Sequence, residues 1–372
     1  MASLLHSLLL DLKRRGQFVL KELGNLETTL PGNFDKHRIE AVDRIRRAIV
    51  MVDNMLIDPD LANPHLEPNF FIDFKRLSEL ILNIEDSSLL ILKRCSPEDR
   101  FLSGLLKLIC DEVKYSDSPP LCGALSFQYF QALMEMDIIM TPQTQAGDLL
   151  ALPDLYHELA HFIVFRQRSI LEVRLLGLIH KFFADALRRG RQQGLPLASL
   201  ESIEDNYALW IGSWHVEFAC DMIATFWCGP AYGWANLRLS ATRGDPYQDS
   251  VTHPADDARR AGIACILRLT GANKAAEEID RNWEDLKRLS PSPQPSSYMK
   301  RYPGRLVEQV GECIYQLCTE LGFQSHSEQQ RSGAVVGCAV AGAWGAFQRD
   351  AAAFPAHEAA ALQALRAKVA ME

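Results

Sequence analysis

The stretch "LPDLYHELAHFIVF", residues 152–165, decides how the rest of the chain is interpreted. His157 and His161 are four positions apart, and Glu158 directly follows the first histidine. Residues four apart on an α-helix share one face, so both imidazoles can reach a single metal ion, while Glu158 lies one step round the helix. The pattern is H-E-x-x-H, in which two histidines bind zinc and the glutamate acts as the general base.

The residues around this motif favour a buried helix over an exposed one. "LYHELAHFIVF" is apolar almost all round, so the two histidines and the glutamate would be buried. Buried polar side chains need partners, and a zinc ion would satisfy all three at once. We expect the helix to run from about 154 to 168, with Asp154 as its N-terminal cap. The alternative is an ordinary helix that carries two surface histidines.

A catalytic zinc needs a third protein ligand and one open position. "SWHVEFACDMIATF" offers Glu217 and Asp221, again four residues apart on an expected helix. Here Glu217 would bind the metal, and Asp221 would accept a hydrogen bond from the outer nitrogen of a ligating histidine and so fix the tautomer of its ring. Two histidines compete with Glu217 for the third position: His180, which lies in an apolar helix, and His215, which points to another face of the same helix as Glu217.

The segment "VTHPADDARRAGI", residues 251–263, offers two further candidates. His253 precedes a proline and therefore lies at a turn or a helix start. A histidine near the metal can donate a hydrogen bond to a developing oxyanion. Arg259 could orient Asp221 or the site glutamate through a charge-assisted hydrogen bond. The alternative for this stretch is a helix N-terminus that carries ordinary surface charges.

Taken together, HELAH, the E-x-x-x-D of 217–221 and the THP of 252–254 resemble the motifs of the gluzincin zinc metallopeptidases, in the group that includes the membrane-bound CAAX prenyl endopeptidases and bacterial heat-shock proteases. The resemblance covers about 155–263. It implies that the two histidines and the later glutamate bind Zn²⁺, that the glutamate inside the motif is the base, and that the His-Pro and Arg segment packs at the active site. These roles would fall to His157, His161, Glu217, Glu158, His253 and Arg259.

Composition limits the other classes of function. The chain has 372 residues, of which 48% are hydrophobic and 23% charged, as in a globular protein with a full core. A net charge of −8 argues against a general nucleic-acid-binding protein, which usually has a basic face. The sequence contains neither a G-x-x-x-x-G-K-[ST] phosphate loop nor a G-x-S-x-G nucleophile elbow.

Cysteine usage and hydropathy bear on the location of the protein. The nine cysteines have irregular spacing without a CxxC pair, which indicates reduced, mostly buried thiols in a cytoplasmic protein. The N-terminal "MASLLHSLLLDLKRRGQ" has its charges after its apolar run, so we expect an amphipathic helix rather than a signal peptide. The most apolar stretch, 332–347, is too short and too rich in Gly and Ala to span a bilayer, and no stable membrane insertion is expected.

The periodicity of the chain predicts a mainly α protein. Ile39, Val42, Ile45, Ile49 and Val52 stand at helical spacing in a helical region that covers residues 1–115. A zincin-like metallopeptidase core over 116–287 would hold a small β-sheet near 124–150, in which "MDIIMTP" is a candidate strand. The Pro- and Ser-rich 288–304 reads as a linker, and 305–372 as a C-terminal helical region. Residues 229–254 are rich in Gly, Pro and polar residues.

The leading hypothesis is a zinc-dependent endopeptidase with Glu158 as general base and a protein or peptide as its substrate. A substrate strand could pair with an edge strand near "MDIIMTP". One alternative is a binding or scaffold protein with a structural zinc, although retention of Glu158 argues against it. Another is a zinc hydrolase that acts on a small amide.

Overall fold

The chain folds into two compact units. A computed structural model describes residues 4–26, 30–63, 65–126, 129–145 and 147–371. Unit 1 comprises Met1–Ser103 and Pro120–Gln143, and unit 2 comprises Gly104–Pro119 and Thr144–Glu372. Both units are built mainly from helices, which confirms the predicted mainly α class.

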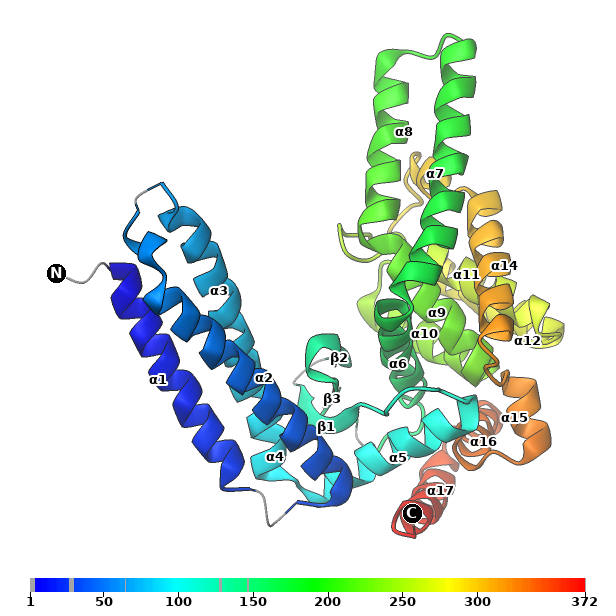
Figure 1. Cartoon of the computed structure of the whole chain (residues 1–372). Helices are drawn as coiled ribbons and strands as arrows, with labels where there is room; N and C mark the ends of the chain where they lie inside the picture. Colours follow the sequence, from blue (N-terminus) through cyan, green and yellow to red (C-terminus); the bar gives the residue numbers. More distant parts are fainter. Residues whose placement is uncertain (1–3, 27–29, 64, 127–128, 146, 372) are drawn as a thin grey trace. The chain divides into compact units, whose positions relative to one another are not determined.

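Unit 1 is a helical bundle with a small sheet. Three long helices, α1, α2 and α3, lie side by side in it (Figure 1). Its elements are α1 (Leu4–Gly24), α2 (Gly32–Ile57), the 3-10 turn η1 (Pro59–Ala62), α3 (Glu67–Asn83), the π-helical η2 (Ile84–Leu89), α4 (Leu90–Arg94), the start of α5 (Pro97–Val113), and the strands with η3 (Met134–Met136). Of the apolar residues predicted to form the buried face of α2, Val42, Ile45 and Val52 are buried, whereas Ile39 is exposed.

The sheet of unit 1 has three strands. β1 (Leu121–Ser126) pairs parallel with β3 (Ile138–Pro142), and β2 (Gln131–Leu133) pairs antiparallel with the other side of β3. The strand order is therefore β1-β3-β2. "MDIIMTP" does contain a strand, the central β3, and the edge strands next to it are β1 and β2.

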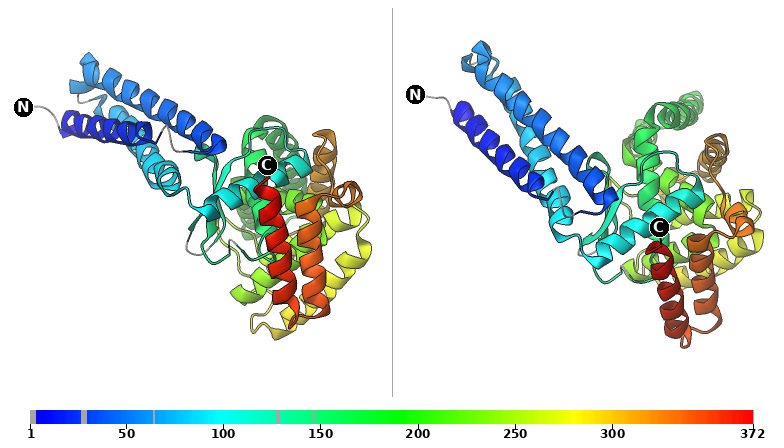
Figure 2. Two further views of the ribbon diagram at one scale, coloured as in Figure 1. Left: turned by 90° about the horizontal axis from the view of Figure 1, so that it is seen from below. Right: turned by 60° about the horizontal axis from the view of Figure 1, so that its bottom comes forward.

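The described part of unit 2 is helical. Besides the end of α5 it holds α6 (Pro153–Arg166), α7 (Arg168–Gln192), α8 (Leu197–Leu209), the π-helical η4 (Trp210–Trp214), α9 (His215–Cys228), α10 (Pro230–Arg243), α11 (Asp256–Leu269), α12 (Asn273–Leu289), α13 (Tyr298–Arg301), α14 (Gly304–Glu320), α15 (His326–Ser332), α16 (Val335–Arg349) and α17 (Phe354–Val369). α7 and α8 form a long hairpin, and α16 packs against α17 (Figures 1 and 2).

Helix α9 is the centre of unit 2. All of its residues except Val216 are buried, because α6, α10, α11 and α14 pack around it. A central helix can bury polar side chains only where neighbouring helices supply hydrogen-bond partners. The polar residues of α9 therefore depend on partners that face them from α6, α10 and α11.

Two segments differ in structure from what their composition suggests. The Gly- and Pro-rich residues after 229 include a complete helix, α10, whose Pro230 occupies the first turn, where a missing N–H costs nothing. The segment 288–304, expected to be a linker, carries two buried tyrosines. The hydroxyl of Tyr298 donates to Asp257, and that of Tyr302 donates to Asp249. Both hydrogen bonds attach this segment to other parts of unit 2.

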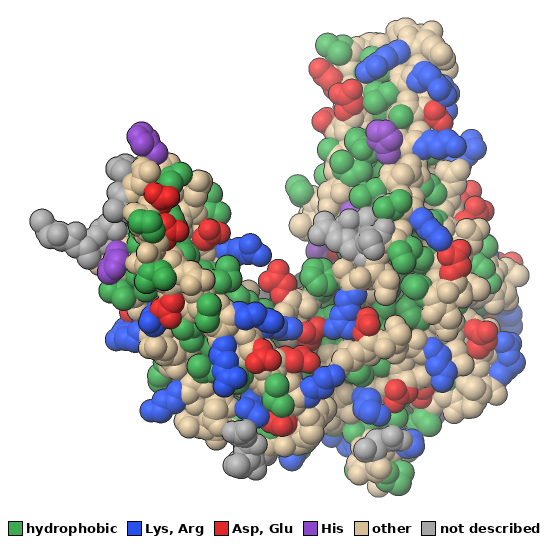
Figure 3. Space-filling model, in the orientation of Figure 1, with side chains coloured by type: hydrophobic (Ala, Val, Ile, Leu, Met, Phe, Trp, Pro, Cys, Tyr) green, Lys and Arg blue, Asp and Glu red, His purple; other side chains and the backbone are tan. Residues whose placement is uncertain are grey.

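None of the helices in the described part of the chain is both long and apolar enough to cross a bilayer. On the face shown in Figure 3, acidic and basic side chains are interspersed with hydrophobic ones. Five of the nine cysteines are buried, and Cys338 is exposed.

Candidate metal centre

The motif helix forms where the sequence predicts it. α6 runs from Pro153 to Arg166 and is buried over most of its length. Its N-cap is Leu152, whose side chain makes no capping hydrogen bond, so the expectation that Asp154 caps the helix is wrong. Asp154 lies instead in the first turn, where its negative charge still interacts favourably with the helix dipole.

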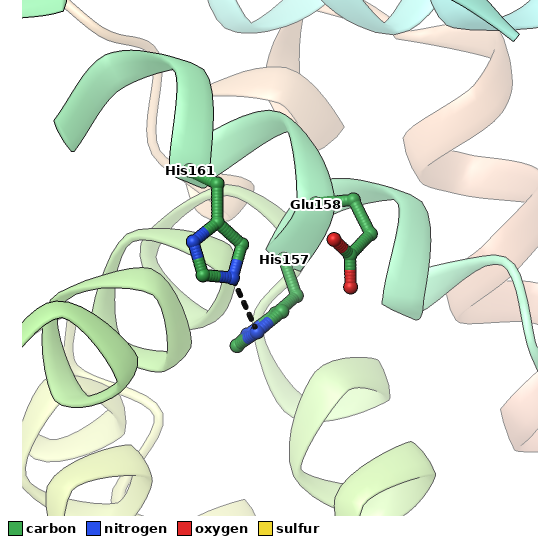
Figure 4. A group of neighbouring side chains, drawn as sticks. All are labelled: His157, Glu158 and His161. Carbon is green, nitrogen blue, oxygen red and sulfur yellow. Dashed lines mark hydrogen bonds between the residues drawn. The ribbon is translucent and has the colours of Figure 1, made fainter. Parts of the chain in front are cut away.

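The two histidines of α6 face each other at their metal-binding nitrogens. Nε2 of His157 and Nε2 of His161 are 3.2 Å apart (Figure 4). Glu158 extends beside His157, and its carboxylate lies in one group with the two rings, with the three candidate ligand atoms within 4.8 Å of one another. The spacing of H-E-x-x-H therefore brings the expected three side chains together.

A second carboxylate, that of Glu217, reaches this group from α9. Oε2 of Glu217 lies 3.6 Å from Nε2 of His157, and Oε1 lies 3.7 Å from Nε2 of His161. Oε2 is buried and has no hydrogen-bond partner. Leaving a buried carboxylate oxygen unsatisfied is costly, so this atom points to a missing partner at the centre of the three side chains.

The separations fit a tetrahedral metal ion. Ligand atoms about 2.1 Å from a tetrahedral zinc lie about 3.4 Å from one another. The Nε2 atoms of His157 and His161 are 3.2 Å apart, and they lie 3.6 and 3.7 Å from Oε2 and Oε1 of Glu217, respectively. Two imidazoles and one carboxylate are also a ligand set found in catalytic zinc sites, where the fourth position stays open. These residues therefore fit Zn²⁺.

Asp221 holds the other side of the His157 ring. Its Oδ1 lies 3.0 Å from Nδ1 of His157. Arg259 of α11 donates two hydrogen bonds of 2.7 Å to Asp221, one to each carboxylate oxygen. Tyr232 of α10 donates a third, of 2.5 Å, to Oδ1. Asp221 is thus fixed from two helices and presents one oxygen to the outer nitrogen of His157, the position expected for a carboxylate that orients a zinc ligand.

The charges of the cluster shift its pKa values in opposite directions. Burial lowers the pKa of His157, but the hydrogen bonds and negative charges of Asp221 and Glu217 outweigh burial and raise it to about 10. Burial, together with the positive charge of His157, lowers the pKa of His161 to about 4. Burial opposes ionisation of Glu217, yet the nearby His157 ring, 3.6 Å away, and the other neighbouring cations lower its pKa to about 2. Arg259 holds the pKa of Asp221 well below its usual range against the same effect of burial.

His253 lies at the edge of the cluster. Its Nε2 is 3.8 Å from Oε2 of Glu217, and 54% of its side chain is exposed. The ring is therefore near the third ligand and open to solvent. Arg259, the other residue predicted from this segment, is buried, and its Nη2 lies 3.7 Å from the same Glu217 oxygen.

The loop that carries His253 is fixed by the π-helical η4. Two consecutive residues of η4 donate to consecutive carbonyls of this loop: Ser213 Oγ to Val251 O at 2.6 Å, and the indole N–H of Trp214 to Ser250 O at 2.9 Å. π-Helical turns insert one extra residue into a helix and are frequent at functional sites. The loop is therefore held close to Glu217 by η4, which leads directly into the helix α9 that carries Glu217.

Each competing histidine has a ring nitrogen directed at a group outside the cluster. Nδ1 of His180 lies 3.1 Å from the hydroxyl of Tyr207 on α8. Nδ1 of His215 lies 2.9 Å from the backbone oxygen of Trp210. These contacts favour Glu217 as the third ligand.

Tyr232 is the residue that sequence reasoning missed. Besides its bond to Asp221, its hydroxyl lies 3.0 Å from Nδ1 of His157, and the two rings are parallel, with an interplanar angle of 4°. It lies in "PAYGWANLRL", whose glycine and proline hide the helix. The buried residues Ala231, Tyr232, Ala235 and Asn236 do stand at helical spacing, and this periodicity is what could have revealed it.

The chain was compared with protein families, curated proteins and solved structures. No family model matches the chain, and no match was found among curated proteins or solved structures. What the cluster can do therefore rests on its own residues.

Proposed function

We propose that the protein is a zinc-dependent metallopeptidase with a zincin-like catalytic core in unit 2. The observation that carries the proposal is the arrangement of His157, His161 and Glu217. Residues 60 positions apart in the chain bring two imidazole nitrogens and the carboxylate of Glu217 to separations close to those of a tetrahedral site, with one buried carboxylate oxygen left without a hydrogen-bond partner. The resemblance of the motifs to those of the gluzincin peptidases agrees with this ligand set.

Glu158 is proposed as the general base. When bound at these residues, Zn²⁺ would polarise a substrate carbonyl and lower the pKa of a water ligand towards neutrality. The Glu158 carboxylate lies beside the ligating rings without being needed as a ligand, and it accepts the proton of the attacking water. A purely structural zinc site has no need of such a base, which favours catalysis over a scaffold role.

His253 and Arg259 are proposed to assist. His253 is exposed and close to Glu217, so its ring is placed to donate a hydrogen bond to the carbonyl oxygen as negative charge develops there. Arg259 acts through Asp221, because its two hydrogen bonds fix the carboxylate that orients His157. The substrate is proposed to be a protein or peptide, and the protein is expected in the cytoplasm.

The test starts with metal content. The purified chain and three variants, His161→Ala, Glu217→Ala and Glu158→Gln, are analysed by elemental mass spectrometry after incubation with Zn²⁺ and removal of the excess. We expect one zinc per chain in the wild type and in Glu158→Gln, and little in the two ligand variants. His180→Ala serves as the matched control and keeps its zinc.

Hydrolysis is then measured with a mixture of unstructured peptides, with products identified by mass spectrometry. The wild type should cut peptide bonds and Glu158→Gln should not, although both hold zinc. A zinc-bound wild type that cuts no peptide but hydrolyses small amides would replace the peptidase with an amidohydrolase. A wild type that takes up no zinc would overturn the proposal.

A further inference from the structure

The hydroxyl of Tyr232 occupies a special place in the cluster. It lies at the corner of a triangle whose other corners are Oδ1 of Asp221, at 2.5 Å, and Nδ1 of His157, at 3.0 Å; the third side, between Asp221 and His157, is also 3.0 Å. Tyr232 and Asp221 therefore contact the same ring nitrogen of His157, Nδ1, which faces away from the metal-binding atoms.

Donor and acceptor roles in this triangle follow from its chemistry. Asp221 accepts two hydrogen bonds from Arg259 and is ionised, so the single O–H of Tyr232 is donated to Asp221. The lone pair of the tyrosine oxygen then faces Nδ1 of His157. With one negatively charged and one neutral acceptor in front of it, Nδ1 must carry a hydrogen, so once His157 is neutral its lone pair is on Nε2, where the metal would bind.

The tyrosine ring itself cannot move easily. It is buried and parallel to the imidazole of His157, with the ring centroids 6.1 Å apart. Its helix begins directly after α9, because Gly229 turns the chain and accepts the first backbone bond from Tyr232, at 3.1 Å. The hydroxyl is therefore placed by a short connection to the same helix that supplies Glu217 and Asp221.

We infer that Tyr232 is a positioning residue of the metal centre: its hydroxyl holds Asp221 and the Nδ1–H tautomer of His157, and so sets the affinity of the site for a divalent metal ion. The inference rests on the proposed zinc site. It concerns metal affinity rather than hydrolysis, so it does not depend on the substrate.

The chain contains a matched control for the loss of a tyrosine hydroxyl. Tyr298 is also buried and also donates a 2.5 Å hydrogen bond to a buried aspartate, Asp257 of α11. Neither Tyr298 nor Asp257 contacts the histidines in the described structure. Tyr232→Phe and Tyr298→Phe therefore remove the same chemical group and keep the ring, one at the metal centre and one away from it.

The experiment measures Zn²⁺ affinity of the full chain by competition with a chromophoric chelator, for the wild type and both variants. Removing partners that orient a zinc-bound histidine typically weakens binding roughly 10- to 100-fold. We expect a loss of this size in Tyr232→Phe and no loss in Tyr298→Phe. Thermal unfolding of the metal-free proteins should show a similar small drop for both, which separates metal positioning from stability.

The absorption spectrum of the Co²⁺-substituted protein gives a second readout. The d–d bands report the geometry of the ligands and should change in Tyr232→Phe but not in Tyr298→Phe. A wild type that binds zinc, with affinity and Co²⁺ spectrum unaltered in Tyr232→Phe, would overturn this inference and leave the proposed function standing. A wild type without zinc binding would overturn both.

Discussion

His157 carries the main electrostatic consequence of the cluster. Although burial favours its neutral form, Asp221 and Glu217 raise its pKa to about 10, so it is protonated at pH 7 in the metal-free protein. A metal ligand must be neutral, and the ion therefore has to displace this proton. His161 has a pKa of about 4 and is already neutral at pH 7. The rings of the two proposed ligands therefore have different protonation states in the metal-free protein at pH 7.

Zinc binding at pH 7 should release about one proton from His157. Because the proton competes with the metal up to the pKa of about 10, zinc affinity should rise about tenfold per pH unit between pH 7 and 9. Titration calorimetry in buffers of different ionisation enthalpy counts the protons released. In Asp221→Asn, the pKa of His157 loses its main supporting interaction, and proton release at pH 7 should fall. Equal release in the two proteins would contradict the assignment of the proton to His157.

Sequence reasoning works well for those site residues whose placement is local. The four-residue interval between His157 and His161 fixes their common face on any helix, and the structure places them as the interval predicts. Glu217 is a candidate from its spacing to Asp221 and from the resemblance, but His180 and His215 compete with it in the sequence, because nothing in local spacing says that α9 packs on α6. Tyr232 was not reached, because its role depends on α10 folding back across α9.

At the scale of elements, the connection between α9 and α10 has the strictest backbone requirement. Gly229 adopts φ +62° and ψ −140°, a conformation open essentially to glycine alone. A Cβ atom at this position would lie 2.4 Å from Cγ of His326 on α15. Both the dihedral angles and the neighbouring ring therefore exclude a side chain where the chain passes from Asp221 to Tyr232.

Gly229→Ala should lower the free energy of unfolding by about 3 kcal/mol or more, because backbone strain and a steric clash add together. Gly244→Ala is the control: Gly244 also has a positive φ, of +81°, but a Cβ there meets nothing within 4 Å. It should cost about 1 kcal/mol. Denaturant unfolding of the two variants checks the difference. Equal losses in the free energy of unfolding would mean that the His326 ring moves aside at no energetic cost, which contradicts the expectation.

Some element boundaries lay beyond what periodicity can show. The sequence predicts a helix around Glu217 and Asp221, whereas the structure has α8, the π-helical η4 and α9 in succession. One inserted residue shifts the apolar face only once, and in so short a stretch such a shift does not stand out from ordinary variation in the spacing of apolar residues. It is stabilised by tertiary contacts, in which Ser213 and Trp214 bond the His253 loop.

At the scale of the whole molecule, the proposed metal centre lies in unit 2. Its proposed ligands and the residues that hold them come from α6, α9, α10 and α11, all within Thr144–Glu372. The division of the chain was harder to predict than its helices. Leu121, Met136 and Ile138 pack in one apolar core with the N-terminal helices and so join 120–143 to them, and a contact between segments far apart in sequence cannot be read from composition.

Zinc should therefore protect only one unit against hydrogen exchange. At a free zinc concentration about 1,000 times the dissociation constant, binding stabilises the folded state by about 4 kcal/mol. Amides of α6, α9, α10 and α11 should exchange more slowly with zinc, while those of Met1–Ser103 should not change. Exchange followed by mass spectrometry with and without Zn²⁺ checks this, and His161→Ala should show no zinc effect. Protection spread evenly over both units would contradict a centre confined to unit 2.

The π-helical η4 also limits how the chain can tolerate changes in length. Gly212 lies in it, is exposed, and would accept a side chain without meeting any atom within 4 Å. Substitution there is harmless, but deletion is not. Removing one residue would convert the turn to α-helix and rotate everything before it by about 100° around the axis of α9. The α7–α8 hairpin would then lose its contacts with neighbouring helices while Glu217 stayed in place. Position 212 therefore tolerates a change of residue type but not the loss of a residue.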